Sequence, residues 1–138
     1  MKITVRNFQN KIPVNPKKVK QAAIKVISAE GKNNSGEITV SFINDRKIRE
    51  LNFKYLHKNA PTDLLVFDLS SKKASGLTAD IIISTDTAIR NAALFNTSPA
   101  EEVKLYLVHG VLHLLGYDDK TPAKRRLMRK KEKEYVNS

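Results

Sequence analysis

Two histidines, His109 and His113, lie four residues apart in an apolar segment that ends at Gly116. Residues at positions i and i+4 share one face of an α-helix, so both imidazoles can direct a nitrogen at one cation. Glycine readily adopts the left-handed conformation that ends many helices, and a chain reversal at Gly116 would bring Asp118 or Asp119 back towards that cation. Two imidazoles and one carboxylate, with a fourth position open to water, are typical of a catalytic zinc site.

The ligand types favour zinc over other metals. The chain contains no cysteine, so a thiolate site is excluded, and two imidazoles disfavour magnesium and calcium. We therefore expect one zinc ion per chain, with nickel, iron or manganese as less favoured alternatives. The competing interpretation is that both residues are ordinary core histidines. Against it, two of the three histidines of the chain occupy this one segment.

The apolar pattern predicts one α+β domain over residues 1–138, with a small mixed sheet of about four strands packed with about five helices. Alternating apolar residues predict strands near 3–5 and 38–42, and short apolar runs predict a buried strand at 64–67 and another at 81–83. Helical spacing and capping residues predict helices beginning near residues 16, 45, 85, 99 and 122. Polar turns are expected at 31–36 and 70–76.

The charge balance favours a polyanionic partner. The formal net charge is +11, from 25 lysines and arginines against 14 acidic residues, and the basic residues concentrate before residue 30 and after residue 119. The last helical segment carries only two acids, Glu132 and Glu134, among many lysines and arginines. Such charge suits RNA or DNA phosphates. For the last helical segment by itself, a solvated basic face is an equally good explanation.

The sequence also indicates a cellular location. The absence of cysteine suits a reducing compartment. The N-terminal residues 1–6 contain no apolar signal region, and no stretch of the chain reaches the length of a membrane span. We expect a cytoplasmic protein that does not contact membranes.

A polar segment between residues 52 and 63 is a candidate for substrate contact, because loops held by rigid elements often carry binding residues. Ordinary turn chemistry explains many of these residue types equally well. His57 could in principle be a third metal ligand, but the short return after Gly116 favours Asp119. The candidate substrate-binding residues are Lys54, His57, Lys58, Thr62 and Asp63.

Taken together, these segments resemble the YbeY family of metal-dependent endoribonucleases. The family's hallmark, His-Gly-x-Leu-His-Leu-x-Gly-Tyr-Asp-His, is matched from His109 to Asp118. Further matches run from Leu51 through Pro61-Thr62-Asp63 to Phe67, and from Asp80 to Ser84. The resemblance implies a zincin-like fold and cleavage of single-stranded RNA. It also implies a role in maturation of the 3′ end of 16S rRNA and in ribosome quality control, with small-subunit rRNA and the ribosome as partners.

Two departures from the family pattern affect the site. Asp119 stands where the family has a third histidine, and a carboxylate is an acceptable zinc ligand. Leu56 stands where the family has an arginine that is thought to contact substrate phosphate. Lys54, His57 or Lys58 could supply the missing positive charge. Asn59 and Val66 also replace the usual aspartate and serine.

The preferred function is zinc-dependent cleavage of single-stranded RNA by a monomer. Asp118 is the candidate for proton handling, although it could instead cap the turn or the last helix. A second interpretation is a ribosome-associated RNA-binding module with weak or lost catalysis, because Leu56 and Asp119 both affect the predicted site. A third is a metal-dependent peptidase or other hydrolase. Gly110 occupies the position of the catalytic glutamate of His-Glu-x-x-His proteases, which weighs against the third.

Overall fold

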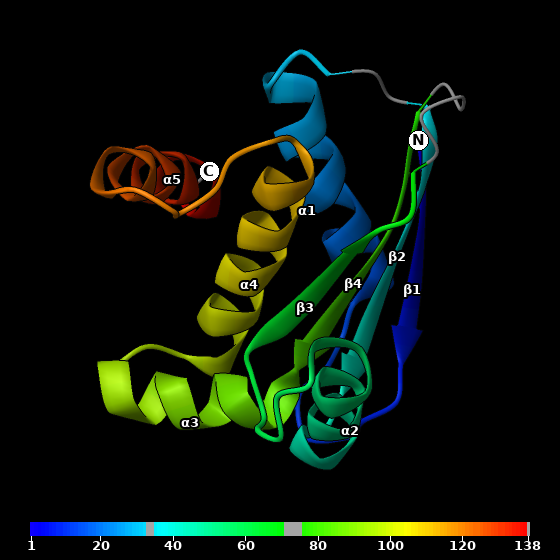
Figure 1. Cartoon of the computed structure of the whole chain (residues 1–138), viewed down its shortest axis with the longest axis vertical. Helices are drawn as coiled ribbons and strands as arrows, with labels where there is room; N and C mark the ends of the chain where they lie inside the picture. Colours follow the sequence, from blue (N-terminus) through cyan, green and yellow to red (C-terminus); the bar gives the residue numbers. More distant parts are fainter. Residues whose placement is uncertain (33–34, 71–75, 138) are drawn as a thin grey trace.

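A computed structural model of the chain describes residues 1–32, 35–70 and 76–137. It contains a four-stranded sheet and five helices (Figure 1). In chain order the elements are β1 (Lys2–Asn7), α1 (Pro16–Ala29), β2 (Gly36–Ile43), α2 (Asp45–Leu56), β3 (Leu64–Asp68), β4 (Leu77–Ser84), α3 (Thr85–Phe95), α4 (Pro99–Leu114) and α5 (Pro122–Val136). The predicted α+β class, with a mixed sheet of four strands and five helices, is confirmed.

The sheet has the strand order β1-β2-β4-β3. Strands β1, β2 and β4 are parallel to one another, whereas β3 pairs with β4 in the antiparallel direction. The register places Leu64 opposite Ile83 and Asp68 opposite Ala79. Because β3 is the last strand of the sheet, one of its edges is available to other parts of the molecule or to a ligand.

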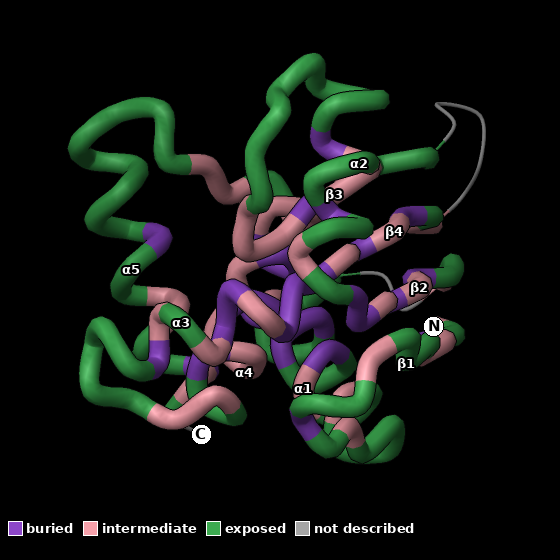
Figure 2. The backbone as a smooth tube through the Cα atoms, turned by 90° about the horizontal axis from the view of Figure 1, so that it is seen from below, coloured by how far each residue is buried: buried purple, intermediate pink, exposed green. Residues whose placement is uncertain are grey.

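The helices cover the two faces of the sheet unequally. Helices α1 and α4 pack on one face, where Ile27 of α1, Val40 of β2 and Val111 of α4 belong to the main core. Helix α2 covers part of the other face through a smaller cluster around Ile48 and Leu65. Helix α5 packs against α4 on the side away from the sheet (Figure 1), and Figure 2 shows that most of α5 is exposed.

Local signals explain why the helices begin where they do. A polar side chain accepts a backbone N–H at the start of every one of the five helices, and proline occupies the first turn of α1, α4 and α5. The capping residues are Asn15, Asn44, Ser84, Ser98 and Thr121. The predicted helix starts are therefore confirmed with their capping chemistry.

One expectation about the sheet is corrected. The run 64–67 was predicted to be a buried strand, but only Leu65 is buried within β3. Its neighbours are partly exposed because β3 forms the sheet edge, where one flank lacks a covering strand. Parts of the two predicted polar turns, at residues 33–34 and 71–75, lie outside the described residues.

Gly110 lets α4 lie close against the sheet. A β-carbon added there would be 3.2 Å from Ile81 Cγ2 and 3.2 Å from Leu64 Cδ1. Residue 110 thus faces the sheet and β3, so a glutamate in its place would project into apolar packing. Within the described residues, no helix is both long enough and apolar enough to cross a membrane.

We predict that Gly110→Val lowers the free energy of unfolding by about 1–3 kcal/mol, because the added methyl groups overfill this contact. Gly110→Ala is the matched control. Its gain in helix propensity, about 1 kcal/mol, offsets the tighter contact, so its stability should remain near that of the wild type. Urea unfolding measures both variants. Equal stability of Gly110→Val and the wild type would show that α4 does not approach the sheet this closely.

Candidate metal centre

The structure brings His109, His113 and Asp119 together. One ligand atom from each residue lies within 4.8 Å of the other two, and the two imidazole rings have centroids 4.9 Å apart. Both histidines are half-buried on α4, while Asp119 is exposed in the connection to α5. Two imidazoles and a carboxylate converging on one point form a donor set that fits zinc, as the spacing of the sequence predicted.

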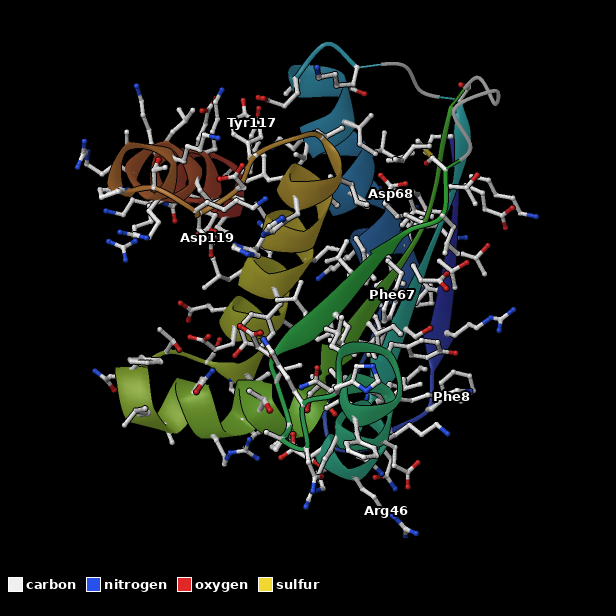
Figure 3. The ribbon with its side chains drawn as sticks, in the orientation of Figure 1. Phe8, Arg46, Phe67, Asp68, Tyr117 and Asp119 are labelled. Atoms are coloured by element: carbon white, nitrogen blue, oxygen red, sulfur yellow. The ribbon has the colours of Figure 1, made fainter. Side chains whose placement is uncertain are left out.

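The end of α4 explains how Asp119 reaches the histidines. The backbone N–H of Tyr117 donates to Leu112 O at 3.1 Å, and Gly116 adopts a positive φ of 104° that reverses the chain. The Arg125 guanidinium of α5 then donates to the backbone oxygen of Asp119 at 3.1 Å. Both the predicted glycine turn and this contact from α5 therefore hold the connection. Figure 3 labels Tyr117 and Asp119 on the segment that follows α4.

Glu132 of α5 hydrogen-bonds the Nδ1 atom of His109. A carboxylate on one ring nitrogen holds the imidazole in a fixed orientation and tautomer, which leaves Nε2 available to a metal ion. The same hydrogen bond raises the pKa of His109 above 6.5, against the opposing effect of burial. Glu132 was visible in the sequence as one of two acids in a basic helix, but nothing local connected it to His109.

The pKa of the second histidine, His113, is shifted in the opposite direction. Burial lowers the pKa of His113 below 6.5, and the neighbouring His109 lowers it further. A neutral imidazole is the form that binds metal, so the surroundings of His113 favour the ligand state.

His109 and Asp119 line a pocket of about 250 Å³ between α4, the start of β3 and α5. Arg125, Arg129 and Glu132 contribute the α5 wall, and their spacing of four and three residues places them on one helix face. The remaining lining residues are Asp63, Leu64, Leu105, Tyr106 and Met128. The pocket therefore combines two members of the candidate metal-binding group with two guanidinium groups.

Tyr106 is the phenol in this pocket. Burial raises its pKa to about 12, against a hydrogen bond from Asn91 Nδ2 to its hydroxyl at 2.7 Å. The hydroxyl consequently stays protonated near neutral pH and can serve as a hydrogen-bond donor but not as a base.

Asp118 is not a member of the three-residue group. Its Oδ1 accepts the backbone N–H of Lys120 at 3.0 Å, and Lys124 Nζ lies 3.5 Å from its Oδ2. The hydrogen bond from Lys120 lowers the pKa of Asp118, with a further contribution from Lys124. These contacts match the turn-capping role that the sequence left open, while the catalytic assignment of Asp118 stays a prediction.

The candidate substrate residues are distributed around the end of α2 and the start of β3. Asp63 lines the metal pocket, and Thr62 Oγ1 donates to its carboxylate at 3.2 Å. His57 ends α2 in a left-handed conformation with a φ of 58°. Lys54 Nζ lies 5.2 Å from the centroid of the Tyr55 ring. Lys58, like Lys54 and His57, is exposed. Of the five predicted residues, only Asp63 is among those that line this pocket.

Glu30, which the sequence did not suggest, connects α1, α5 and the turn at the C-terminal end of α4. Its carboxylate accepts hydrogen bonds from the hydroxyls of Tyr117 and Tyr135, and from Lys131 Nζ at 3.1 Å. The Glu30 side chain is only 8% exposed. Because Tyr117 lies two residues before Asp119, this cluster fixes the start of the turn that carries Asp119.

The mixed sheet, the paired histidines on α4 and a pocket that contains Arg125 and Arg129 define an α+β protein with a candidate metal site. The family model described as Endoribonuclease YbeY matches residues 4–138. The chain belongs to the YbeY endoribonuclease family, which confirms the resemblance inferred from its motifs and identifies it as a nuclease of the hydrolase class.

Individual relatives agree with this membership. The chain is 34% identical to Endoribonuclease YbeY of Syntrophus aciditrophicus, over 97% of the chain and 87% of that protein. It is 36% identical to Endoribonuclease YbeY of Pelotomaculum thermopropionicum, over 99% of the chain and 95% of that protein. A solution structure from Thermotoga maritima has a similar fold, with a TM-score of 0.70 and 26% identity over 98% of this chain and 87% of that one.

We predict that Glu132→Gln weakens zinc binding by roughly 10- to 100-fold, because the amide orients and polarises His109 less well than the carboxylate does. Glu134→Gln is the matched control, since Glu134 is on the same helix and its side chain is 55% exposed. Competition with a chelating dye measures both affinities. Equal affinities would contradict the assigned role of Glu132.

We further predict that Glu30→Gln lowers the free energy of unfolding by about 1–3 kcal/mol at neutral pH. Burial raises the pKa of Glu30, but the hydrogen bonds from Tyr117, Tyr135 and Lys131 outweigh it and bring the pKa below 4.5. A lowered folded-state pKa means that the stabilisation is present above pH 4.5 and is lost as the pH falls through the folded-state value.

Urea unfolding between neutral and acidic pH tests this prediction. The stability difference between wild type and Glu30→Gln should shrink as the pH falls below 4.5. Glu37→Gln, at an exposed position on β2, is the control and should match the wild type throughout. A pH-independent difference would show that the charge of Glu30 does not stabilise the cluster.

Proposed function

We propose that this chain is a zinc-dependent endoribonuclease that cleaves single-stranded RNA. The observation that carries the proposal is the group formed by His109, His113 and Asp119. Two of its members, His109 and Asp119, line one pocket with Arg125 and Arg129. A bound zinc ion would supply a water of lowered pKa and polarise a phosphoryl oxygen. The residues around the metal-binding group would then have to hold the RNA and orient its phosphate.

The guanidinium groups are suited to hold the scissile phosphate. Arg129 lines the pocket from α5, and guanidinium pairs with phosphate through parallel hydrogen bonds. Arg125 also donates to the backbone of Asp119, so its role includes positioning that ligand. These arginines can supply the positive charge that the family places at the position of Leu56, and they lie in the metal pocket itself.

The start of β3 is suited to binding the RNA substrate. Asp63 in the pocket can accept a hydrogen bond from a ribose 2′-hydroxyl, a group that DNA lacks. The flanking nucleotides would be held by residues near the end of α2 and in the connection to β3, namely Lys54, His57, Lys58 and Thr62. Asp118 is a weaker candidate for proton handling because lysine contacts already engage its carboxylate.

The finer assignments follow from this chemistry and from the family. We propose that residues 1–138 form a single catalytic domain that binds one zinc ion, with nickel, iron or manganese less favoured. Its RNA substrate would be small-subunit rRNA at the 3′ end of 16S rRNA, processed on the ribosome by a monomeric protein. That substrate would place the protein in the cytoplasm, with a role in ribosome quality control.

We predict that Arg129→Ala reduces kcat/KM for a fluorescent single-stranded RNA by about 10- to 100-fold, the equivalent of one hydrogen bond to a charged group. Zinc content should stay at the wild-type level, because Arg129 is not a ligand. Arg126→Ala is the matched control, because Arg126 is exposed on the same helix and is not among the residues lining the pocket. His57→Ala and Lys58→Ala test the approach to β3 in the same assay.

The outcomes separate the competing functions. Cleavage that requires zinc and Arg129, and that stops with EDTA, supports the ribonuclease. Tight RNA binding by zinc-loaded protein without cleavage would instead select the RNA-binding module with lost catalysis. Hydrolysis of peptides in preference to RNA would overturn the assignment, although a glutamate equivalent to that of the proteases is excluded by the sheet contact of Gly110.

A further inference from the structure

A second and larger hollow lies between α1 and α4, away from the metal centre. Its volume is about 710 Å³, within the range of roughly 300–1,000 Å³ that is typical of ligand sites. Val19, Ala22 and Val26 of α1 line one wall, and Val103 and Leu107 of α4 line the other. This α1–α4 groove is therefore walled mainly by aliphatic side chains at helical spacing.

The α1–α4 groove and the histidines lie on opposite flanks of α4. At 3.6 residues per turn, the groove positions 100, 103, 104 and 107 centre roughly 150° around the helix from His109 and His113. Gly110 faces the sheet between these two flanks. A ligand in the groove would consequently leave the metal pocket open to RNA.

Lysines surround the aliphatic walls. Lys18 and Lys25 on α1 and Lys104 on α4 line the groove, and Lys18 and Lys25 are exposed. Helix α1 contains four lysines and no acidic residue over Pro16–Ala29. An occupant must therefore present apolar side chains to the walls and negative charge to the rim.

Single-stranded RNA fits this combination poorly. RNA without base pairing binds through exposed aromatic rings on which bases stack, whereas the aromatic residues of the groove, Phe42 and Tyr135, are buried, with exposures of 0% and 5%. A second copy of this chain is also disfavoured, because its net charge of +11 would meet the same lysines.

We propose that the α1–α4 groove is a docking site for an acidic amphipathic helix of a partner protein. The α1 wall from Lys18 to Val26 is about 12 Å long, which accommodates roughly two turns of helix. Apolar residues of the partner at positions i, i+3, i+4 and i+7 enter the groove, and its flanking glutamates or aspartates pair with the lysine rim. The complementary charges speed association and set the orientation.

The test uses a fluorescent synthetic peptide of about 15 residues with leucines at that spacing and glutamates elsewhere. Fluorescence anisotropy should show saturable binding to the full chain. A peptide of the same composition with the leucine stripe scrambled should bind at least about tenfold more weakly. Absence of saturable binding, or equal binding of both peptides, would overturn the proposal.

Paired charge reversals locate the binding site. Lys18→Glu with Lys25→Glu should weaken peptide binding by about tenfold or more while leaving RNA cleavage unchanged. Lys2→Glu with Arg6→Glu makes the same change in net charge at exposed positions of β1, and should leave peptide binding near the wild-type value. Equal losses in both double variants would show only a general charge effect and would overturn the assignment.

RNA competition separates this proposal from the proposed ribonuclease activity. A single-stranded RNA that fills the metal pocket should not displace the peptide, and the peptide should not inhibit cleavage. Mutual displacement would contradict a separate docking site. Because peptide binding does not depend on zinc, this proposal stands or fails independently of the catalytic assignment.

Discussion

Helix α4 must pack against the sheet and carry a polar site at the same time, and the rest of the structure depends on how it does so. Gly110 allows the helix to approach Ile81 and Leu64 closely, while His109, one residue earlier, points towards α5. Seven residues of α4 are buried, as its packing between sheet and helices requires. The histidines therefore belong to a rigid element, which fixes their separation before any metal binds.

Helix α5 completes the site and also contributes to the main core. Its Met128 and Tyr135 are buried against the body of the molecule, while Glu132 holds His109 and Arg125 holds the backbone of Asp119. The Glu30 cluster also connects α5 to α1 and to the turn after α4. The exposed Asp119 is thus restrained by contacts on both sides of its turn.

The sequence predicted the features that depend on local chemistry. Helix starts followed from capping residues such as Ser98 and from proline in the first turn, and the return of Asp119 towards His113 followed from Gly116. These signals operate within a few residues, so they can be recognised without knowledge of the fold.

Features that depend on distant segments could not be predicted in this way. A short apolar run has the same pattern in a central and an edge strand, so the partial exposure of β3 required the strand order. The partnership of Glu132 with His109, and that of Glu30 with Tyr117, joins residues 23 and 87 positions apart. Neither of these two pairs is marked by a periodic pattern in the sequence. By contrast, Arg125, Arg129 and Glu132 share one helix face, so their joint lining of the pocket could have been suspected.

The central claim is that Asp119, and not the adjacent Asp118, completes the metal centre with His109 and His113. Elemental analysis of purified wild type, Asp119→Ala and Asp118→Ala after equilibration with zinc tests it most directly. We predict about one zinc ion per chain in the wild type and in Asp118→Ala, and a large loss of zinc in Asp119→Ala. Full zinc retention in Asp119→Ala, with loss in Asp118→Ala, would contradict the account.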